Sequence, residues 1–208
     1  MSFRVGVLVS GEGTNLQAIL DTLHGRDGIE VVAVGASRAD ARGLERAAAA
    51  GVDRAAFEIS AHEDRDARDR ALGDWLEQHE VDLVVLAGFM EILGGEFIRR
   101  FQGRIVNVHP SLLPAFPGVR AIEQALEHGV KVSGVTVHFV DEGVDSGPII
   151  LQEALELPYA RDIGVVEERV HAIEHRLLPR AVSLIAAGKV RADPDNPRVV
   201  RIEDDDAG

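Results

Sequence analysis

The chain has 208 residues, 46% of them hydrophobic, and a mean hydropathy of +0.02, which predicts a soluble globular protein with one sizeable domain. Its 22 lysines and arginines stand against 35 aspartates and glutamates, and a net charge of -13 argues against a nucleic-acid partner. The absence of cysteine excludes disulfide bonds, thiol catalysis and cysteine metal sites. No apolar run reaches 18 residues, and the apolar start is too short for a signal peptide, so we expect a cytoplasmic protein with no membrane partner.

Short runs rich in β-branched residues alternate with helical runs along the chain. We expect strands at residues 4–10, 31–37, 55–60, 81–88, from 105, 131–140 and 148–157. We expect helices at residues 15–23, 41–50, 66–80, 95–101, 121–128 and 162–187. Gly51 and Gly129 should cap the second and fifth helices, and Pro179 should bend or interrupt the last. The alternation predicts a doubly wound α/β fold with a mostly parallel, Rossmann-like sheet and helices on both faces.

In such a sheet, ligands bind beyond the carboxyl ends of the strands. We expect a single domain over residues 1–190 and a polar, acidic tail over residues 191–208. Within that tail, "RVVRI" at residues 198–202 is predicted to pair at a sheet edge, and the last six residues are predicted to be disordered.

The first candidate site is "SGEGTN", residues 10–15, which joins a strand to a helix. Gly11 and Gly13 permit a tight turn and a close backbone approach, while Thr14 and Asn15 are expected to cap a helix whose N-terminus attracts anions. The pattern is typical of a phosphate cradle. It is neither a dinucleotide fingerprint, because Leu16 occupies the third glycine position, nor a P-loop. An ordinary turn with a good cap remains the alternative.

The second and third candidates are "IVNVHPSLLPAFPG", residues 105–118, and "VHFVDEGVDSGP", residues 137–148. Asn107 and His109 stand two residues apart on a strand and so project to the same side, and Asp145 follows His138 in a glycine-rich loop. An amide, an imidazole and a carboxylate suffice for acyl-type transfer, with the amide stabilising an oxyanion and the imidazole moving a proton. No hydroxyl or thiol nucleophile is marked, which favours direct transfer. A purely structural histidine at a strand end is the alternative.

Four segments together carry a resemblance: "SGEGTNLQAIL", "VVLAGFMEIL", "NVHPSLLPAFPG" and "DSGPIILQ". From about Val5 to Pro179 the chain resembles the folate-dependent formyltransferases, and among them those of purine synthesis. The resemblance implies a Rossmann-like fold and transfer of a formyl group from 10-formyltetrahydrofolate to the amine of 5-phosphoribosylglycinamide (GAR), with no metal. It also implies a phosphate-binding half over about residues 1–100, a folate and catalytic half over about residues 100–190, and a monomer or homodimer.

The family's functional positions transfer onto residues of this chain. The resemblance implies the catalytic set Asn107, His109 and Asp145, with His138 in a supporting role. It implies GAR binding by Gly13, Thr14, Asn15 and Glu174. It implies folate binding by Arg65, Met90, Glu91, Ile92, Leu93 and Asn107.

The chain departs from the family at four positions. Glu91 stands where the family often has arginine, and Ala115 replaces a common lysine. Arg120 and Ile122 occupy positions where relatives often have histidine. These departures put in doubt the affinity for the tail of the folate, and the loop after Pro117 is expected to move or bind differently. They leave the catalytic set intact.

Several other functions compete with this one. His171 and His175 lie four residues apart on a helix and, with Asp145 or Glu174, predict a divalent-metal hydrolase as one rival. A phosphate- or folate-binding regulator without catalysis is another. The related methionyl-tRNA formyltransferase needs a further tRNA-binding domain and a basic surface, and the related formyltetrahydrofolate hydrolase normally carries an extra N-terminal regulatory domain.

Overall fold

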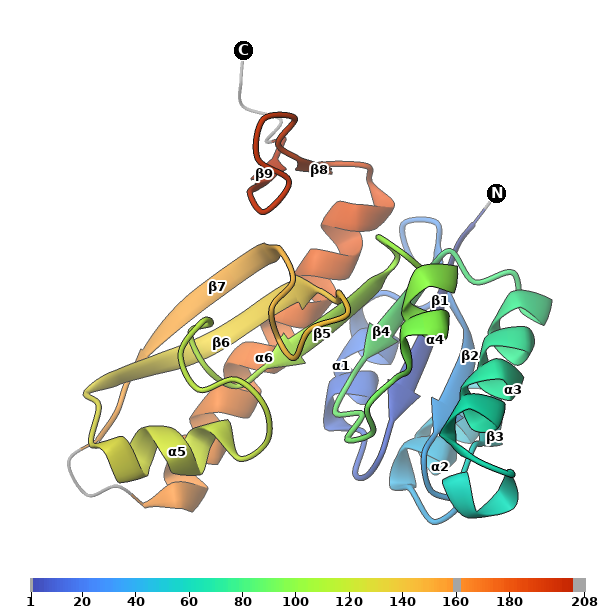
Figure 1. Ribbon diagram of the computed structural model, residues 1–208, viewed down its shortest axis with the longest axis horizontal. Helices are drawn as coiled ribbons and strands as arrows, with labels where there is room; N and C mark the ends of the chain where they lie inside the picture. The colour runs from blue at the N-terminus through green and yellow to red at the C-terminus, as the bar shows by residue number, and fades with distance from the viewer. Residues whose placement is uncertain (1, 159–161, 204–208) are drawn as a thin grey trace. The chain divides into compact units, whose positions relative to one another are not determined.

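A computed structural model describes residues 2–158 and 162–203. Its strands are β1 (Phe3–Val9), β2 (Ile29–Ala36), β3 (Asp53–Ala56), β4 (Leu83–Leu86), β5 (Ile105–His109), β6 (Val132–Phe139) and β7 (Ile149–Glu156). They form a sheet in the order β3-β2-β1-β4-β5-β6-β7 (Figure 1). The neighbours from β3 to β5 pair in parallel, and β6 and β7 pair antiparallel, which confirms the mostly parallel sheet.

The chain divides into two compact units, Met1–Asn107 and Val108–Gly208. The first contains the helices α1 (Thr14–Thr22), α2 (Arg42–Ala49), α3 (Arg65–Gln78) and α4 (Gly95–Arg100) and the 3-10 turn η1 (Ile59–Ala61). The strand order runs outward from β1 to β3 and then returns to β4 and β5. Because crossovers between parallel strands are right-handed, this reversal puts α1 and α2 on one face of the strands and α3 and α4 on the other (Figure 1).

The core of the first unit lies along its two central strands. Val5, Val7 and Leu8 of β1 are fully buried, and all four residues of β4 are buried. A strand covered on both faces has no solvent side, so its sequence is apolar throughout rather than alternating. This is why residues 81–88 predict a buried strand so clearly.

The edge of the first unit differs from the prediction. We expected a strand at residues 55–60, but β3 begins at Asp53 and ends at Ala56, and Ile59 begins the 3-10 turn η1. Edge strands are often short, and three of the four residues of β3 are exposed. Gly51, the expected cap of α2, lies one residue beyond the cap and has a φ of 71°. The Gly51 and Val52 amides donate to the carbonyls of Ala48 and Ala47, the two bonds of a Schellman motif.

The second unit contains α5 (Ala121–His128) and α6 (Ile163–Ala186), and α6 packs against both β6 and β7. We expected Pro179 to bend or interrupt this helix, and α6 continues through it without interruption. A proline inside a helix costs about 3 kcal/mol. Here the helix retains buried Leu177, Leu178 and Val182 around the proline, and burial of such side chains offsets a cost of that size.

The C-terminal tail forms a hairpin of β8 (Val190–Ala192) and β9 (Val200–Ile202). The segment 198–202 therefore pairs chiefly with β8 rather than with the main sheet, to which it adds a single bridge between Val199 and Ile149. Of the six final residues that we expected to be disordered, Glu203 donates its amide to the Lys189 carbonyl, and residues 204–208 lie outside the described residues.

In the two described ranges no helix is long and apolar enough to cross a membrane. The cytoplasmic location, the oligomeric state and the single domain over residues 1–190 with its two functional halves stay predictions.

Candidate active site

The loop after β1 is shaped by a close approach of two glycines. Gly13 caps α1 with a φ of 69°, and a Cβ added to it would lie 2.7 Å from Cα of Gly43 in α2. Gly11, by contrast, is exposed, and an added Cβ there would meet nothing within 4 Å. The capping predicted for Thr14 and Asn15 is wrong: both lie inside α1, and the capping residue is a glycine with no side chain to offer.

Ser10 connects this loop to the segment that follows β4. Its amide donates to the Gly88 carbonyl over 3.1 Å, and its hydroxyl accepts from the Met90 amide over 2.8 Å. The Ser37 hydroxyl donates to the same oxygen over 2.7 Å. The structure therefore brings the predicted phosphate loop and the predicted folate segment, residues 90–93, side by side. Sequence reasoning missed Ser10, although it stands in the quoted motif.

The predicted folate segment combines exposed and anchored residues. Met90 is 70% exposed and Ile92 64% exposed, while Leu93 is buried and Glu91 is half-buried. Arg65, predicted to contact folate, is the exposed first residue of α3.

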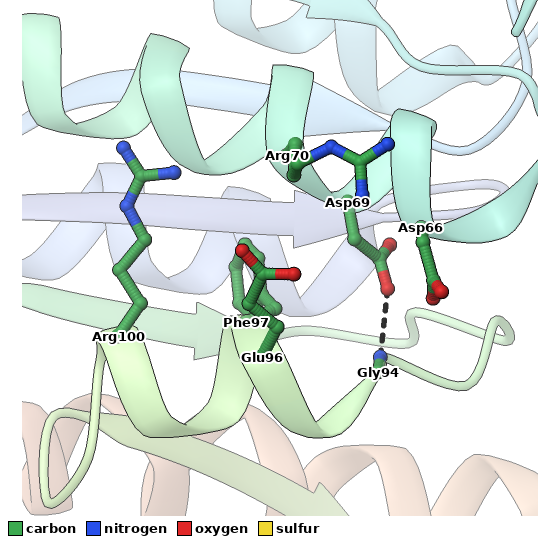
Figure 2. A pocket seen from close by; sticks show the side chains of 7 residues that line it. All are labelled: Asp66, Asp69, Arg70, Gly94, Glu96, Phe97 and Arg100. Atoms are coloured by element: carbon green, nitrogen blue, oxygen red, sulfur yellow. Dashed lines mark hydrogen bonds between the residues drawn. The ribbon is translucent and has the colours of Figure 1, made fainter.

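One turn further along α3, two buried charged residues contact this segment. Arg68 Nη2 lies 3.5 Å from the Ile92 carbonyl, and Asp69 accepts the Gly94 amide over 2.7 Å (Figure 2). Sequence reasoning missed both residues, because a run of alternating charges is typical of a solvated helix face.

His109 ends β5 and is buried between two acceptor oxygens. Its Nε2 lies 2.8 Å from the Phe116 carbonyl oxygen, and its Nδ1 lies 3.3 Å from Oδ2 of Asp145. A carbonyl only accepts, so Nε2 must carry a hydrogen, and a carboxylate likewise favours a hydrogen on Nδ1. With a hydrogen on both ring nitrogens, His109 would face both oxygens as a donor.

Asp145 is the centre of this cluster. Its φ of 49° lies in the left-handed region, which aspartate tolerates better than most residues. Oδ2 accepts the Gly118 amide over 2.7 Å, and Oδ1 lies 3.6 Å from Nε2 of His138. Burial alone would raise the pKa of Asp145, but the His138 contact, the Gly118 amide and the charge of His109 together hold that pKa below its ordinary value. The carboxylate is therefore ionised at neutral pH.

His138 and Asn107 lie on neighbouring strands of the sheet order. His138 is buried on β6, with its Nδ1 2.8 Å from the carbonyl oxygen of Phe139. Asn107 is half-buried, pairs with Leu86 of β4 and stands two residues before His109, so the two project to the same side of β5. The structure thus groups His109, His138 and Asp145, with Asn107 on the strand that carries His109.

Glu174 is buried in the middle of α6, whereas a mid-helix glutamate is usually exposed. Oε2 lies 2.9 Å from Nδ1 of His171, and this hydrogen bond raises the pKa of His171. His175 stacks on His171 with ring centroids 6.1 Å apart, and burial lowers its pKa. Over residues 2–158 and 162–203 no group of three or more His, Asp or Glu side chains is placed to hold a metal ion, so the geometry does not favour a metal hydrolase.

The departures from the family pattern lie mostly in the loop after β5. The Ala115 carbonyl accepts from the Ser111 hydroxyl over 2.5 Å. Arg120 caps α5 with a φ of 61° and pairs with Glu123, and Ile122 is buried. The side chains of Arg120 and Ile122 therefore serve local structure, whereas Ala115 contributes its backbone carbonyl.

Comparisons with known proteins show what the chain as a whole resembles. The chain is 46% identical to the phosphoribosylglycinamide formyltransferase of Mycobacterium tuberculosis, over 88% of the chain and 85% of that protein. It is similar to the crystal structure of glycinamide ribonucleotide transformylase 1 from Symbiobacterium toebii, with a TM-score of 0.93, 50% identity, and coverage of 98% of this chain and 95% of that one.

A larger protein is also similar. The bovine trifunctional purine biosynthetic protein adenosine-3 is 42% identical over 97% of the chain, which spans about a fifth of the length of that relative. The model of the formyl transferase family matches residues 3–182. Since this match covers most of the chain, the protein belongs to the formyl transferase family.

Proposed function

We propose that this chain transfers a formyl group from 10-formyltetrahydrofolate to the amine of GAR, giving formyl-GAR and tetrahydrofolate, in de novo purine biosynthesis. The names of its relatives support GAR as the acceptor and a formyl group as what is transferred. The observation that carries the proposal is the environment of His109, whose two ring nitrogens face the Phe116 carbonyl and the ionised Asp145. A buried imidazole that faces two acceptor oxygens is suited to acyl transfer, because in its protonated form it stabilises an oxyanion and then gives up a proton.

The transfer begins when the GAR amine attacks the formyl carbon and a tetrahedral intermediate forms. The negative charge that develops on the formyl oxygen is stabilised by the Asn107 amide and by the protonated His109, while Asp145 holds that proton in place. Nε2 already donates to the Phe116 carbonyl, so its donation to the oxyanion requires that this hydrogen bond be exchanged.

The intermediate collapses when the bond from the formyl carbon to the folate nitrogen breaks. His109 donates its proton to that departing nitrogen, and the proton lost by the attacking amine returns through Asp145 or water. His138, 3.6 Å from the other carboxylate oxygen, supports the charge of Asp145.

GAR has an anionic end and a cationic end, and the proposal assigns each a binding group. The phosphate binds at the N-terminus of α1, to Gly13, Thr14 and Asn15, where backbone N–H groups and the helix dipole attract anions. Glu174 binds the glycinamide end, since its buried carboxylate is a strong acceptor for an amine.

The folate pterin binds along the backbone of residues 90–93. The exposed Met90 and Ile92 offer apolar side chains to an aromatic ring, and Leu93 anchors the segment in the core. Arg65, exposed at the start of α3, is assigned to the anionic tail of the folate. Glu91 carries no positive charge, so in this assignment Arg65 is the residue that offers one to the tail.

An absorbance assay for tetrahydrofolate formation, run with and without GAR, tests the proposal. We expect product only when both substrates are present. Loss of formyl-folate at the same rate without GAR would instead identify a formyltetrahydrofolate hydrolase. Binding of both substrates with no product would identify a regulator.

A further inference from the structure

A buried charged pair on α3 holds the loop between β4 and α4. We propose that Arg68 and Asp69 are positioning residues that fix the backbone of residues 89–94, and thereby set the affinity for the formyl-folate substrate. The inference rests on the proposed function, which assigns this backbone to the pterin.

Arg68 contacts the loop from the buried side of α3. Its side chain is fully buried, and Nε lies 2.6 Å from Oδ1 of Asp69. The guanidinium carbon lies 5.7 Å from the centroid of the Phe89 ring, and Nη2 lies 3.5 Å from the Ile92 carbonyl oxygen. Arg68 therefore contacts the loop at two residues on either side of Met90, one through a ring face and one through the backbone.

Asp69 fixes the far end of the same loop. Its Oδ2 accepts the Gly94 amide over 2.7 Å (Figure 2). Its Oδ1 remains paired with Arg68. Gly94 is also the capping residue of α4, and its carbonyl accepts the Ile98 amide. One carboxylate thus joins the guanidinium, the end of the loop and the start of the next helix.

The energetics favour a positioning role over a role in stability alone. Burying two charges carries a large desolvation penalty. A well-packed apolar pair of similar volume would not carry it. Nη1 of Arg68 is also buried without a hydrogen-bond partner, so the pair is not optimised as a stabilising contact. The pair contacts the loop on its buried side. The Met90 and Ile92 side chains are exposed, while the Ile92 carbonyl lies 3.5 Å from Arg68 and the Gly94 amide donates to Asp69. Placement of such backbone matters for turnover, because small displacements of binding groups are costly.

Kinetics of Arg68→Met and Asp69→Asn test the inference. Met keeps most of the volume of arginine but not its charge, and Asn keeps an oxygen near Gly94 but loses the ion pair. We expect the KM for 10-formyltetrahydrofolate to rise about tenfold or more, since a displaced binding loop is costly. The KM for GAR should stay within about twofold of the parent, because the displaced loop binds the folate substrate and its loss does not weaken GAR binding. The matched control is Arg70→Met, a change on the same helix at an exposed residue, which should leave both constants unchanged.

Hydrogen exchange separates failure of this inference from failure of the proposed function. If the parent does not turn over both substrates, the proposed function is wrong, and the positioning role is then decided by amide exchange alone. Slow exchange of the Gly94 amide in the parent, faster in either variant, supports the role. Fast exchange of that amide in the parent overturns it, and this measurement also decides the matter if Arg68→Met does not fold. An unchanged KM for 10-formyltetrahydrofolate in both folded variants overturns it equally.

Discussion

The loop after β1 and the cluster around Asp145 use different parts of the polypeptide. In the loop, the residue with positive φ is Gly13, and the chemistry proposed there belongs to backbone N–H groups. In the cluster, Asp145 itself has a positive φ, and the chemistry belongs to side chains. A site made of backbone is shaped by packing, so bulky replacements test folding and binding together. A site made of side chains accepts replacements of equal shape, which test chemistry alone.

The largest effect on the side-chain site is expected from Asn107→Ala. The change removes one proposed oxyanion donor, and loss of such a donor costs about 100-fold in kcat, roughly 3 kcal/mol. Turnover with both substrates saturating measures it. The matched control is Asn196→Ala in the C-terminal hairpin, where the amide oxygen accepts from the Arg198 backbone. A kcat within about threefold of the parent would remove Asn107 from the chemistry.

Asp145→Asn sharpens the comparison, because it keeps the shape of the side chain and removes only its charge. The pKa of Asp145 lies below its ordinary value, so the parent carries a full negative charge throughout the neutral range. We expect about a tenfold loss of turnover at neutral pH, and an alkaline limb that moves toward acid by about one pH unit, equivalent to roughly 1.4 kcal/mol. Turnover partly recovers as the pH falls, because the proton on His109 is then retained without the carboxylate.

The direction of this displacement decides the role of Asp145. The control is Asp141→Asn. Asp141 lies in the same loop and accepts hydrogen bonds from Gly143 and Ser146. The alkaline limb of the pH profile of this variant should stay in place. An Asp145→Asn limb that stays in place, or moves to higher pH, would show that the carboxylate does not sustain the charge on His109.

A pair of glycine variants separates binding from folding in the backbone site. Gly13→Ala forces a Cβ to within 2.7 Å of the Gly43 backbone at a φ of 69°, so we expect it to lower the free energy of unfolding by at least about 1 kcal/mol. Gly11→Ala meets no neighbour and should leave stability unchanged. We expect its methyl group to lie where the phosphate approaches the N-terminus of α1, and so to raise the KM for GAR about tenfold.

Urea unfolding and steady-state kinetics measure the two effects. A Gly11→Ala variant that raises the KM for 10-formyltetrahydrofolate while leaving the KM for GAR unchanged would contradict the phosphate assignment. Gly13→Val would not separate the loss of stability from the loss of GAR binding, because a valine side chain at this position clashes with α2.

Much of the fold could be predicted because its sequence signals are local. Residues 81–88 are apolar throughout, and the helical stripe of Leu16, Ile19, Leu20 and Leu23 is buried as its period predicts. The failures occur where tertiary context decides. β3 is short because it lies at an edge, and α6 continues through Pro179 because its other residues are buried against the sheet.

The site could be predicted where one side chain carries the chemistry, and less well where one residue supports another. The cluster of His109, His138 and Asp145 follows from motifs at strand ends, and the structure brings these residues together. Arg68 and Asp69 stand in "HEDRDARDR", where neighbouring charges hide the two that are buried. Only the position of the helix against the 89–94 loop distinguishes them from Arg65 and Arg70, and that position is a tertiary property.

The smallest effect is expected at His171, which lies beside the proposed GAR carboxylate. Its hydrogen bond to Glu174 raises its pKa above the ordinary value of 6.5, so its contribution to stability is full below that pH and is lost as the pH rises through the folded pKa. The side chain is half exposed, so solvent screening limits the contribution to less than about 1 kcal/mol. His171→Gln should therefore lower the melting temperature slightly at about pH 6 and not at about pH 9, where the parent histidine is already neutral. His128→Gln on α5, whose ring bonds the Gln124 carbonyl instead of a carboxylate, is the control without that pH dependence. Equal losses at both pH values would show that His171 stabilises α6 by packing, and that its proton does not support the carboxylate of Glu174.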